Sequence, residues 1–241
     1  DKSDAIIRAC DEVIRGKFKE EFIVDPIQGG AGTSTNMNAN EVIANRGNEM
    51  AGRKLLHPND DINKSQSSND TFPTAMHIAA VLAIEDSLFP AMDRLIATFR
   101  RLEKENEGIV KSGRTHLQDA VPIAFSQEIS GWRNMLEKTK AQLSLALPGL
   151  KELALGGTAV GTGLNAPEGF DTAVAREISN ITGREFRTAE NKFHALTSKD
   201  ELVFAHGALK ALACDMMKIA NDVRWLASGP RDGLGEIFIP E

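Results

Sequence analysis

Residues 202–220, LVFAHGALKALACDMMKIA, carry the pattern on which the fold assignment depends. They lie within a helical run that we expect over residues 198–228, where a Gly-Pro pair ends it. Leu, Ala, Met and Ile occupy more than one face of this run, which predicts burial against this chain and against other chains. A helix of about 30 residues spans roughly 45 Å, more than a compact domain of this size needs. We therefore expect an all-α fold, an elongated bundle of long helices, in an oligomer.

Two further long runs and three shorter ones show the same helical spacing. The long runs are expected over residues 71–106, which Pro90 should kink or interrupt, and over residues 123–147. The shorter runs are expected over residues 4–17, 36–52 and 167–182. Strand signals are weak, at residues 22–27 and 109–111, and there is no βαβ rhythm. We divide the chain into residues 1–70, the remainder of an N-terminal domain, and residues 71–241, a central domain built from the long-helix bundle.

The composition of the chain excludes several classes of function. The 241 residues carry a formal net charge of -6, which argues against electrostatic attraction to nucleic acid or to a membrane surface. Cys10 and Cys214 are far apart and are read as reduced packing residues of an intracellular protein, in the cytoplasm or an organelle matrix. No signal peptide is recognised, nor an apolar run long enough to cross a bilayer. Neither GxGxxG nor the Walker motif occurs in the sequence, and no cluster of His, Cys, Asp and Glu has metal-ligand spacing; the resemblance described below implies no metal and no organic cofactor.

Four loops between the helices are rich in glycine, hydroxyl and amide groups. They are QGGAGTSTNMNAN (28–40), NKSQSSND (63–70), SGRTHLQDAVP (112–122) and GGTAVGTGLN (156–165). Glycines let backbone N–H groups approach a ligand, helix N-termini favour anions, and Ser and Asn bind a carboxylate without titrating. Capping of the following helix, with Asn69 or Asp70 as N-cap after the second loop, explains the same residue types. Binding and simple capping or packing therefore both stay open.

His116, in the third loop, is the candidate acid/base residue. Histidine is the side chain that titrates nearest to neutral pH, but a single histidine is also an ordinary loop residue. His77 and His206 lie inside expected helices and are read as packed or capping residues. Lys218 and Arg224, in the last helix, are read as solvated or paired cations.

Five motifs occur together and in order along the whole chain. They are GTSTNMNANEV, NKSQSSNDTFPTAMHIA, GRTHLQDAVP, GGTAVGTGLN and MKIANDVRWLASGPR. In this order and at this approximate spacing they resemble the fumarase/aspartase superfamily. One such motif would be weak support, whereas five in order are strong.

This resemblance implies a homotetramer with a shared bundle of long helices, and active sites made from loops of three subunits. It implies a lyase that needs no cofactor and acts on a small dicarboxylate, as in the tricarboxylic acid cycle. A proton leaves the carbon next to a carboxylate, water or ammonia leaves its neighbour, and an aci-carboxylate dianion is the intermediate. Position by position, the resemblance assigns catalysis to His116, substrate contacts to Thr33, Ser67, Ser68, Asn69 and Thr115, and a secondary dicarboxylate site to His57, Asn59 and Asp60.

The chain also departs from the family pattern. The flexible loop GSS-x-MP-x-K-x-N, which supplies a serine base and a carboxylate clamp, should follow residues 239–241 and is not in the sequence. Most of the N-terminal region is missing, and the region around His57 is a few residues short. We therefore expect a truncated chain, and we predict that residues 1–241 alone do not turn over substrate.

Some motif residues resemble fumarases, which release water, and others resemble aspartases, which release ammonia. Ser68 resembles class II fumarases, because aspartases usually carry threonine at that position. Ala31 resembles aspartases, because fumarases usually carry serine there. The balance favours reversible hydration of fumarate to malate, with aspartate ammonia-lyase as the alternative.

Two readings from other classes of protein stay open. Relatives similar to argininosuccinate lyase serve as lens crystallins, and long helices alone would suit a structural or scaffold protein. The intact THLQD and SQSSND loops argue against lost catalysis, and a scaffold has no use for four polar loops.

Overall fold

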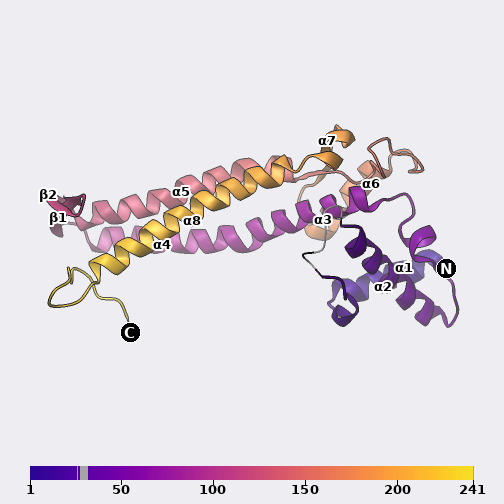
Figure 1. The fold of residues 1–241 in the computed structure, drawn as a ribbon, viewed down its shortest axis with the longest axis horizontal. Coiled ribbons are helices and arrows are strands. Elements are labelled where there is room, and N and C mark those ends of the chain that lie inside the picture. Colours follow the sequence, from indigo (N-terminus) through magenta and orange to yellow (C-terminus); the bar gives the residue numbers. More distant parts are fainter. Residues whose placement is uncertain (26, 28–31, 241) are drawn as a thin grey trace. The chain divides into compact units, whose positions relative to one another are not determined.

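The computed structural model describes residues 1–25, 27 and 32–240. They form two compact units. The first unit comprises Asp1–Ala79 and Leu150–Lys199, and the second comprises Ala80–Gly149 and Asp200–Glu241. Among the described residues there are eight α-helices and two small two-stranded sheets (Figure 1), which confirms the all-α prediction.

The second unit is built on three long helices that lie side by side in Figure 1: α4 (Phe89–Glu105), α5 (Phe125–Leu150) and α8 (Asp200–Leu226). Their shared core takes one stripe of apolar side chains from each helix. The stripe of α5 recurs at intervals of three, four or seven residues, as a buried helix face requires. The core residues are Met92, Ile96, Phe99, Ile129, Trp132, Leu136, Leu143, Ala208, Leu212, Ile219 and Leu226.

Trp132 is the largest side chain in this core. Its ring centroid lies 6.0 Å from that of Phe99 and 6.3 Å from that of Phe125, the latter in an edge-on arrangement. The indole N–H is satisfied by Asp222 of α8, whose Oδ2 accepts its hydrogen bond at 2.9 Å. A buried Trp needs such a partner, so this contact joins α5 to α8 by a polar as well as an apolar interaction.

The predicted interruption at Pro90 is confirmed. Helix α3 (Ser68–Leu82) is followed by one π-helical stretch, η3 (Ala83–Leu88), and only then by α4, in whose first turn Pro90 lies. Proline lacks the N–H that would close the preceding helical turn, and a π-turn is a known way to accommodate the loss.

The first unit combines short helices with one very small sheet. Strands β3 (Glu152–Leu153) and β4 (Arg187–Thr188) pair in parallel, and α6 lies between them in sequence. The absence of a βαβ rhythm therefore did not exclude a two-residue parallel pair, because strands this short leave no periodic signal. The helices are α1 (Lys2–Ile14), η1 (Lys19–Glu21), α2 (Thr33–Ala51), η2 (Pro58–Ile62), α3, α6 (Phe170–Thr182) and α7 (Lys192–Thr197).

The third polar loop is a β-hairpin rather than an irregular loop. Strands β1 (Val110–Thr115) and β2 (Gln118–Ala124) pair antiparallel, from Val110 opposite Ala124 to Thr115 opposite Gln118. The weak strand signal at 109–111 was real but too short, because polar residues and a proline hide the alternation in 112–122. The other signal was wrong, since residues 22–25 and 27 form no strand.

The division into compact units differs from the predicted division into domains. Residues 150–199 belong to the same unit as the N-terminal 79 residues, whereas the sequence was divided once, after residue 70. Compactness in space and independent folding are different properties, so the boundary at residue 70 stays a prediction about folding domains.

One helical run is apolar and long enough to pass a test for membrane spans. Ser68–Glu105 contains an 18-residue window of mean hydropathy 1.3, of which 17% is buried, so the expectation that no such run exists was wrong. Length and composition alone are weak grounds for a membrane span, because apolar helices that pack in protein cores and interfaces pass the same test.

Candidate active site

The start of α3 is organised by a capping box. Ser67 is the residue before the helix, and its Oγ accepts the N–H of Asn69 at 3.2 Å. In return, Oδ1 of Asp70 accepts the N–H of Ser67 at 2.9 Å. This reciprocal pair satisfies backbone donors that a helix start leaves unpaired. The N-cap is therefore Ser67, not Asn69 or Asp70 as the sequence suggested.

The glycine-rich loop at 156–165 lies against this helix start. Oδ2 of Asp70 accepts the N–H groups of Gly156 and Thr158 at 3.1 and 2.8 Å. Nδ2 of Asn69 donates to the carbonyl of Ala159 at 2.9 Å. Gly156 has a φ of +98°, and a Cβ there would lie 2.3 Å from Cβ of Asp171, so only glycine fits. The packing reading of this loop is thus correct in part, and it brings the loop to the Ser67–Asn69 segment.

A network of amides joins the start of α2 to the same place. Oδ1 of Asn63 accepts from Nδ2 of Asn36 and of Asn40, each at 3.1 Å. Oδ1 of Asn36 in turn accepts the hydroxyl of Thr71 at 3.1 Å. Neutral groups that bind one another in this way hold two helix starts together without any net charge.

Thr33 is the first residue of α2 and is exposed. Gly32, its neighbour, has a φ of +70°, and a Cβ there would lie 2.1 Å from the ring of Phe72 in α3. This close approach again requires glycine. Residues 28–31 of the first polar loop, which include Ala31, lie outside the described residues.

A cavity of about 470 Å³ opens beside these loops. It brings Ser67 and Ser68, predicted to contact substrate, together with Asn59, predicted for the secondary site. Most of its polar lining is neutral, with Lys64 as the cation among its lining residues. Hydroxyl and amide donors beside a helix N-terminus, with one cation, suit a small carboxylate. Other lining residues include Asn63, Gln66, Thr158, Thr162 and Asn165.

Asn69 lies on a neighbouring surface. It lines a smaller hollow of about 240 Å³ with Phe72 and Val160, and its amide N–H is directed to the carbonyl of Ala159. In this structure Asn69 therefore joins the two loops, and its predicted substrate contact stays a prediction.

The predicted secondary site occupies one turn of chain. Nδ1 of His57 accepts the N–H of Asp60 at 3.2 Å, which makes His57 the N-cap of η2. The N–H of His57 donates to Asp61, and Asp61 also binds Lys2 at 2.7 Å. The side chains of His57 and Asp60 are 51% and 76% exposed, so both are accessible to a ligand.

In the second unit, His116 lies at the tip of the β1–β2 hairpin. His116 and Leu117 form its two-residue loop, and both have positive φ, 49° and 61°. Two-residue hairpin loops favour such angles, but glycine or asparagine normally supplies them. A non-glycine residue in this region is strained by about 1–3 kcal/mol, and such strain is concentrated at functional sites. Thr115, the other predicted residue, ends β1 and is exposed.

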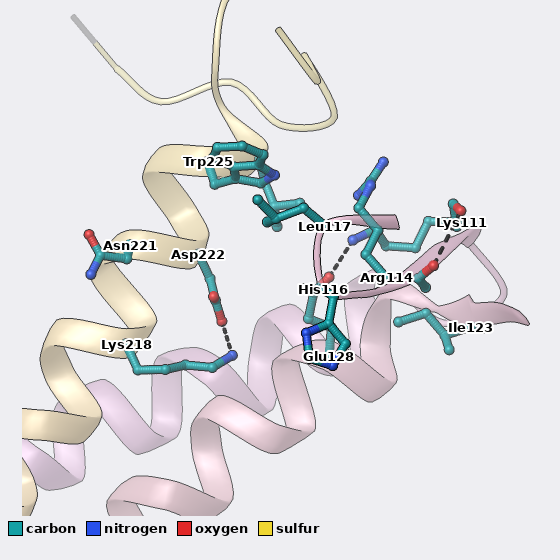
Figure 2. Close-up of a pocket in the computed structure, with 13 residues that line it drawn as sticks. Lys111, Arg114, His116, Leu117, Ile123, Glu128, Lys218, Asn221, Asp222 and Trp225 are labelled. Carbon is teal, nitrogen blue, oxygen red and sulfur yellow. Dashed lines mark hydrogen bonds and ion pairs between the residues drawn. The ribbon is translucent and has the colours of Figure 1, made fainter. Parts of the chain in front are cut away.

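A pocket of about 490 Å³ lies between this hairpin and α8 (Figure 2). Figure 2 shows His116 and Leu117 at the hairpin tip, and Lys218, Asn221 and Trp225 on the helix that borders the same space. Lys218 forms an ion pair with Asp222, which confirms that it is a paired cation. An exposed imidazole beside an amide and a paired cation can exchange protons with a bound anion.

Ion pairs attach the hairpin to the rest of its unit. Nζ of Lys111 lies 2.6 Å from Glu128 of α5 and 2.9 Å from Glu236. Nη2 of Arg114 lies 2.5 Å from the other oxygen of Glu236. Burial alone would raise the pKa of Glu236, but hydrogen bonds from Arg114 and Lys111 outweigh it and lower that pKa. The carboxylate is therefore ionised and holds two cations of β1.

The candidate residues thus fall into two groups, one in each compact unit. The first unit holds Thr33, Ser67, Ser68, Asn69, His57, Asn59 and Asp60, and the second holds Thr115 and His116. Sequence reasoning missed Asp70 and Glu236 as organising carboxylates, because their partners lie far away in the chain. Among the described residues, no group of three or more His, Cys, Asp or Glu could hold a metal ion.

Comparison with known proteins agrees with the motifs. A family model described as "Lyase" matches residues 1–241. Class II fumarate hydratases of Bacillus cereus and Campylobacter jejuni are 59% and 57% identical over 244 and 245 residues, which is 100% of this chain and 53% of theirs. The chain thus spans about half the length of the curated relatives it matches.

Solved structures show the same fold. A class II fumarase from Schistosoma mansoni superposes with a TM-score of 0.93 at 38% identity, over 96% of this chain and 53% of its own. A "fumarate lyase:delta crystallin" from Brucella melitensis superposes with a TM-score of 0.94 at 45% sequence identity, over 99% of this chain and 53% of its own. The match to the whole chain, with the five ordered motifs, shows that the chain belongs to the lyase family and, within it, to the fumarase/aspartase superfamily.

Proposed function

We propose that the full-length protein is a class II fumarate hydratase, a lyase that interconverts fumarate and malate by reversible anti-hydration. The observation that carries this proposal is the cavity beside the start of α3, where Ser67 and Ser68 present neutral donors within a fold shared with fumarases. Relatives named "Fumarate hydratase class II" at 56–59% identity support the choice of water over ammonia.

The chemistry needs donors that bind more tightly as negative charge grows. When malate is dehydrated, a proton leaves the carbon next to one carboxylate, and hydroxide leaves the neighbouring carbon with a second proton. Charge accumulates on the carboxylate as the aci-carboxylate dianion forms. Hydroxyl and amide donors at a helix N-terminus stabilise that charge more than the charge of the substrate, which lowers the barrier.

We assign substrate binding to Thr33, Ser67, Ser68, Asn69 and Thr115, and proton transfer to His116. The strained position of His116 at a hairpin tip and its place in a pocket support an active role. His57, Asn59 and Asp60 are assigned to a secondary dicarboxylate site, supported by the exposure of His57 and Asp60. A His57→Asn variant should weaken dicarboxylate binding at this second site and leave kcat for fumarate within about twofold, since no reacting atom is contacted.

The direct test is fumarate consumption by the full-length protein, with and without ammonium, followed by identification of the product. Malate formed without ammonium supports the proposal. Aspartate formed only with ammonium would instead establish an aspartate ammonia-lyase. No product in either case would turn attention to a structural role, which the delta-crystallin relatives make the next alternative.

We further propose a homotetramer with active sites shared between subunits. Support comes from α8, which exposes Val203, Phe204 and Met217 to 68%, 51% and 64%, more apolar surface than a helix in a monomer needs. Mixing inactive His116→Asn and Ser68→Ala subunits should restore part of the activity if subunits share sites, and should restore none if each site is built from one subunit.

Two finer proposals follow from the family. We place the enzyme in the cytoplasm, which cell fractionation tests. We also expect residues 1–241 by themselves to be inactive, because the flexible loop with the proposed serine base is not among them. An active preparation of residues 1–241 would contradict that expectation.

A further inference from the structure

Asp70 is a charged side chain in an unusual place. It is 0% exposed, and it lies in the first turn of α3, directly after the three residues assigned to substrate binding. Burial raises the pKa of its carboxyl, although the backbone N–H groups that it binds favour the ionised form. Placing a carboxylate where water cannot reach it is costly. The hydrogen bonds that this carboxylate accepts from backbone N–H groups offset part of that cost.

These hydrogen bonds join two loops that are distant in sequence. Oδ1 binds the N–H of Ser67 at 2.9 Å, and Oδ2 binds the N–H groups of Gly156 and Thr158 at 3.1 and 2.8 Å. Gly156 and Thr158 lie 86 and 88 residues after Asp70 in the sequence. One rigid carboxylate group therefore sets the distance between the Ser67–Asn69 segment and the glycine-rich loop.

The segment that leads into the glycine-rich loop has hydrogen bonds besides those to Asp70. Nζ of Lys192 donates to the carbonyls of Leu153 and Leu155 at 2.9 and 3.0 Å. The N–H of Leu155 donates to Oγ1 of Thr74, which is 3% exposed, at 3.0 Å. The residues directly before the donors that Asp70 uses are thus held by contacts of their own. In the segment before α3, Ser65 has a positive φ of 64°, which a residue other than glycine rarely adopts.

We propose that Asp70 is a positioning residue for the dicarboxylate site: its carboxylate orients the backbone of Ser67, and with it the side chains of Ser67, Ser68 and Asn69, against the glycine-rich loop. This inference rests on the proposed function for the identity of the ligand. Asp70 itself is fully buried and touches no substrate. Its effect reaches substrate only through the residues that it orients.

The test substitutes Asp70→Asn in the full-length protein. Asparagine has the same shape but only one acceptor oxygen, so either Ser67 or the Gly156–Thr158 pair must face an NH2 group. The loss of a hydrogen bond to a buried charge corresponds to about a 10- to 100-fold effect, as does a misplacement of about 1 Å at a site. We expect kcat/KM for fumarate to fall by about this factor, and the Kd for succinate to rise at least about tenfold.

Thr74→Val is the matched control. Thr74 lies one turn after Asp70 on the same helix, is as deeply buried, and binds the same glycine-rich segment, but it makes no contact with Ser67 or Asn69 among the bonds that fix the site. Valine leaves the N–H of Leu155 unpaired, so the thermal midpoint should fall about as far as in Asp70→Asn. The Kd for succinate should stay within about threefold of the wild-type value.

Gly156→Ala provides a second approach if Asp70→Asn does not fold. A methyl group there would meet Asp171 and displace the N–H that Asp70 binds, so the same weakening of succinate binding is expected. Equal succinate affinity in Asp70→Asn and Thr74→Val, or failure of both Asp70→Asn and Gly156→Ala to fold while Thr74→Val folds, would overturn the positioning role. A wild type that makes no malate would refute the proposed function instead, and the succinate Kd values of the variants still decide the role of Asp70.

Discussion

The ion network below His116 makes a quantitative prediction. Glu236 is shared by two cations of β1, Lys111 and Arg114, and Arg114 is two residues before His116. Replacing Glu236 by Gln keeps the shape and one acceptor but removes the charge. Lys111 then keeps the charge of Glu128, whereas among the described residues the carboxylate left beside Arg114 is Asp119, whose Oδ1 lies 3.9 Å from Nε. The substitution therefore releases mainly Arg114, and with it the hairpin tip.

The size of the effect follows from exposure. Side chains of Glu236, Arg114 and Lys111 are 23%, 20% and 11% exposed. Removing one partner of a fully buried pair costs about 3–5 kcal/mol, and exposed pairs contribute about 0.2–1 kcal/mol. Because this network is partly buried and lies between these limits, Glu236→Gln should lower the free energy of unfolding by about 2 kcal/mol. Because the tip carries His116, we also expect kcat to fall by about tenfold or more, since small misplacements of catalytic groups are costly.

The assay compares Glu236→Gln with Glu128→Gln in the full-length protein, by urea unfolding at fixed protein concentration and by fumarate hydration. Glu128→Gln removes a partner of Lys111 but leaves the pair between Arg114 and Glu236 in place. Because it removes one ion pair rather than two, and Lys111 keeps Glu236, it should cost about 1 kcal/mol and leave kcat within about threefold. If the two variants had the same kcat, the reasoning that Arg114 holds the hairpin tip through Glu236 would be refuted.

Three further outcomes are expected. Leu117→Val should destabilise the protein by about 1–2 kcal/mol, because valine is branched at Cβ and tolerates positive φ less well than leucine. Leu117→Gly should stay within about 1 kcal/mol of wild type, and equal stability of the two variants would contradict the strained turn. Asp222→Leu should cost about 1–3 kcal/mol in urea unfolding by leaving the buried indole N–H of Trp132 unpaired, and Asp222→Asn, which keeps an acceptor, should cost less. Hydrogen bonds from Arg46 and then Lys17 lower the pKa of Glu12 to about 2. The ionised Glu12 therefore stabilises the folded protein fully above its ordinary pKa of 4.5, and this stabilisation is lost as the pH falls towards 2. The free energies of unfolding of wild type and Glu12→Gln, measured against pH, should converge near pH 2, and a constant difference between them would show that ionised Glu12 contributes nothing.

The helices of this protein could be predicted closely because helical signals are local. The run expected over 198–228 is α8, Asp200–Leu226, and the run expected over 123–147 is α5, Phe125–Leu150. Apolar residues three, four and seven positions apart report on one face of a single helix, whatever surrounds it. The interruption near Pro90 is equally local, since proline removes its own N–H.

The β1–β2 hairpin could not be predicted as closely as the helices, because its local sequence signals are weak. Its turn residues, His116 and Leu117, are not the Asn-Gly type that marks two-residue hairpin loops. Strand β2 is exposed along most of its length, and a strand without a buried face does not need alternating apolar and polar residues. The strained turn is visible only from the backbone angles, and it coincides with the residue to which the motifs had assigned catalysis.

Local sequence therefore determined the helix positions, the fold class and the chemical type of the polar loops, because periodicity, capping and glycine act within a few residues. The tertiary structure decided which loops meet and which carboxylates organise them. Asp70 finds its donors 86 and 88 residues away, and Arg114 finds Glu236 122 residues away. No spacing rule connects such pairs, because these residues come within hydrogen-bonding distance only when the chain has packed in three dimensions.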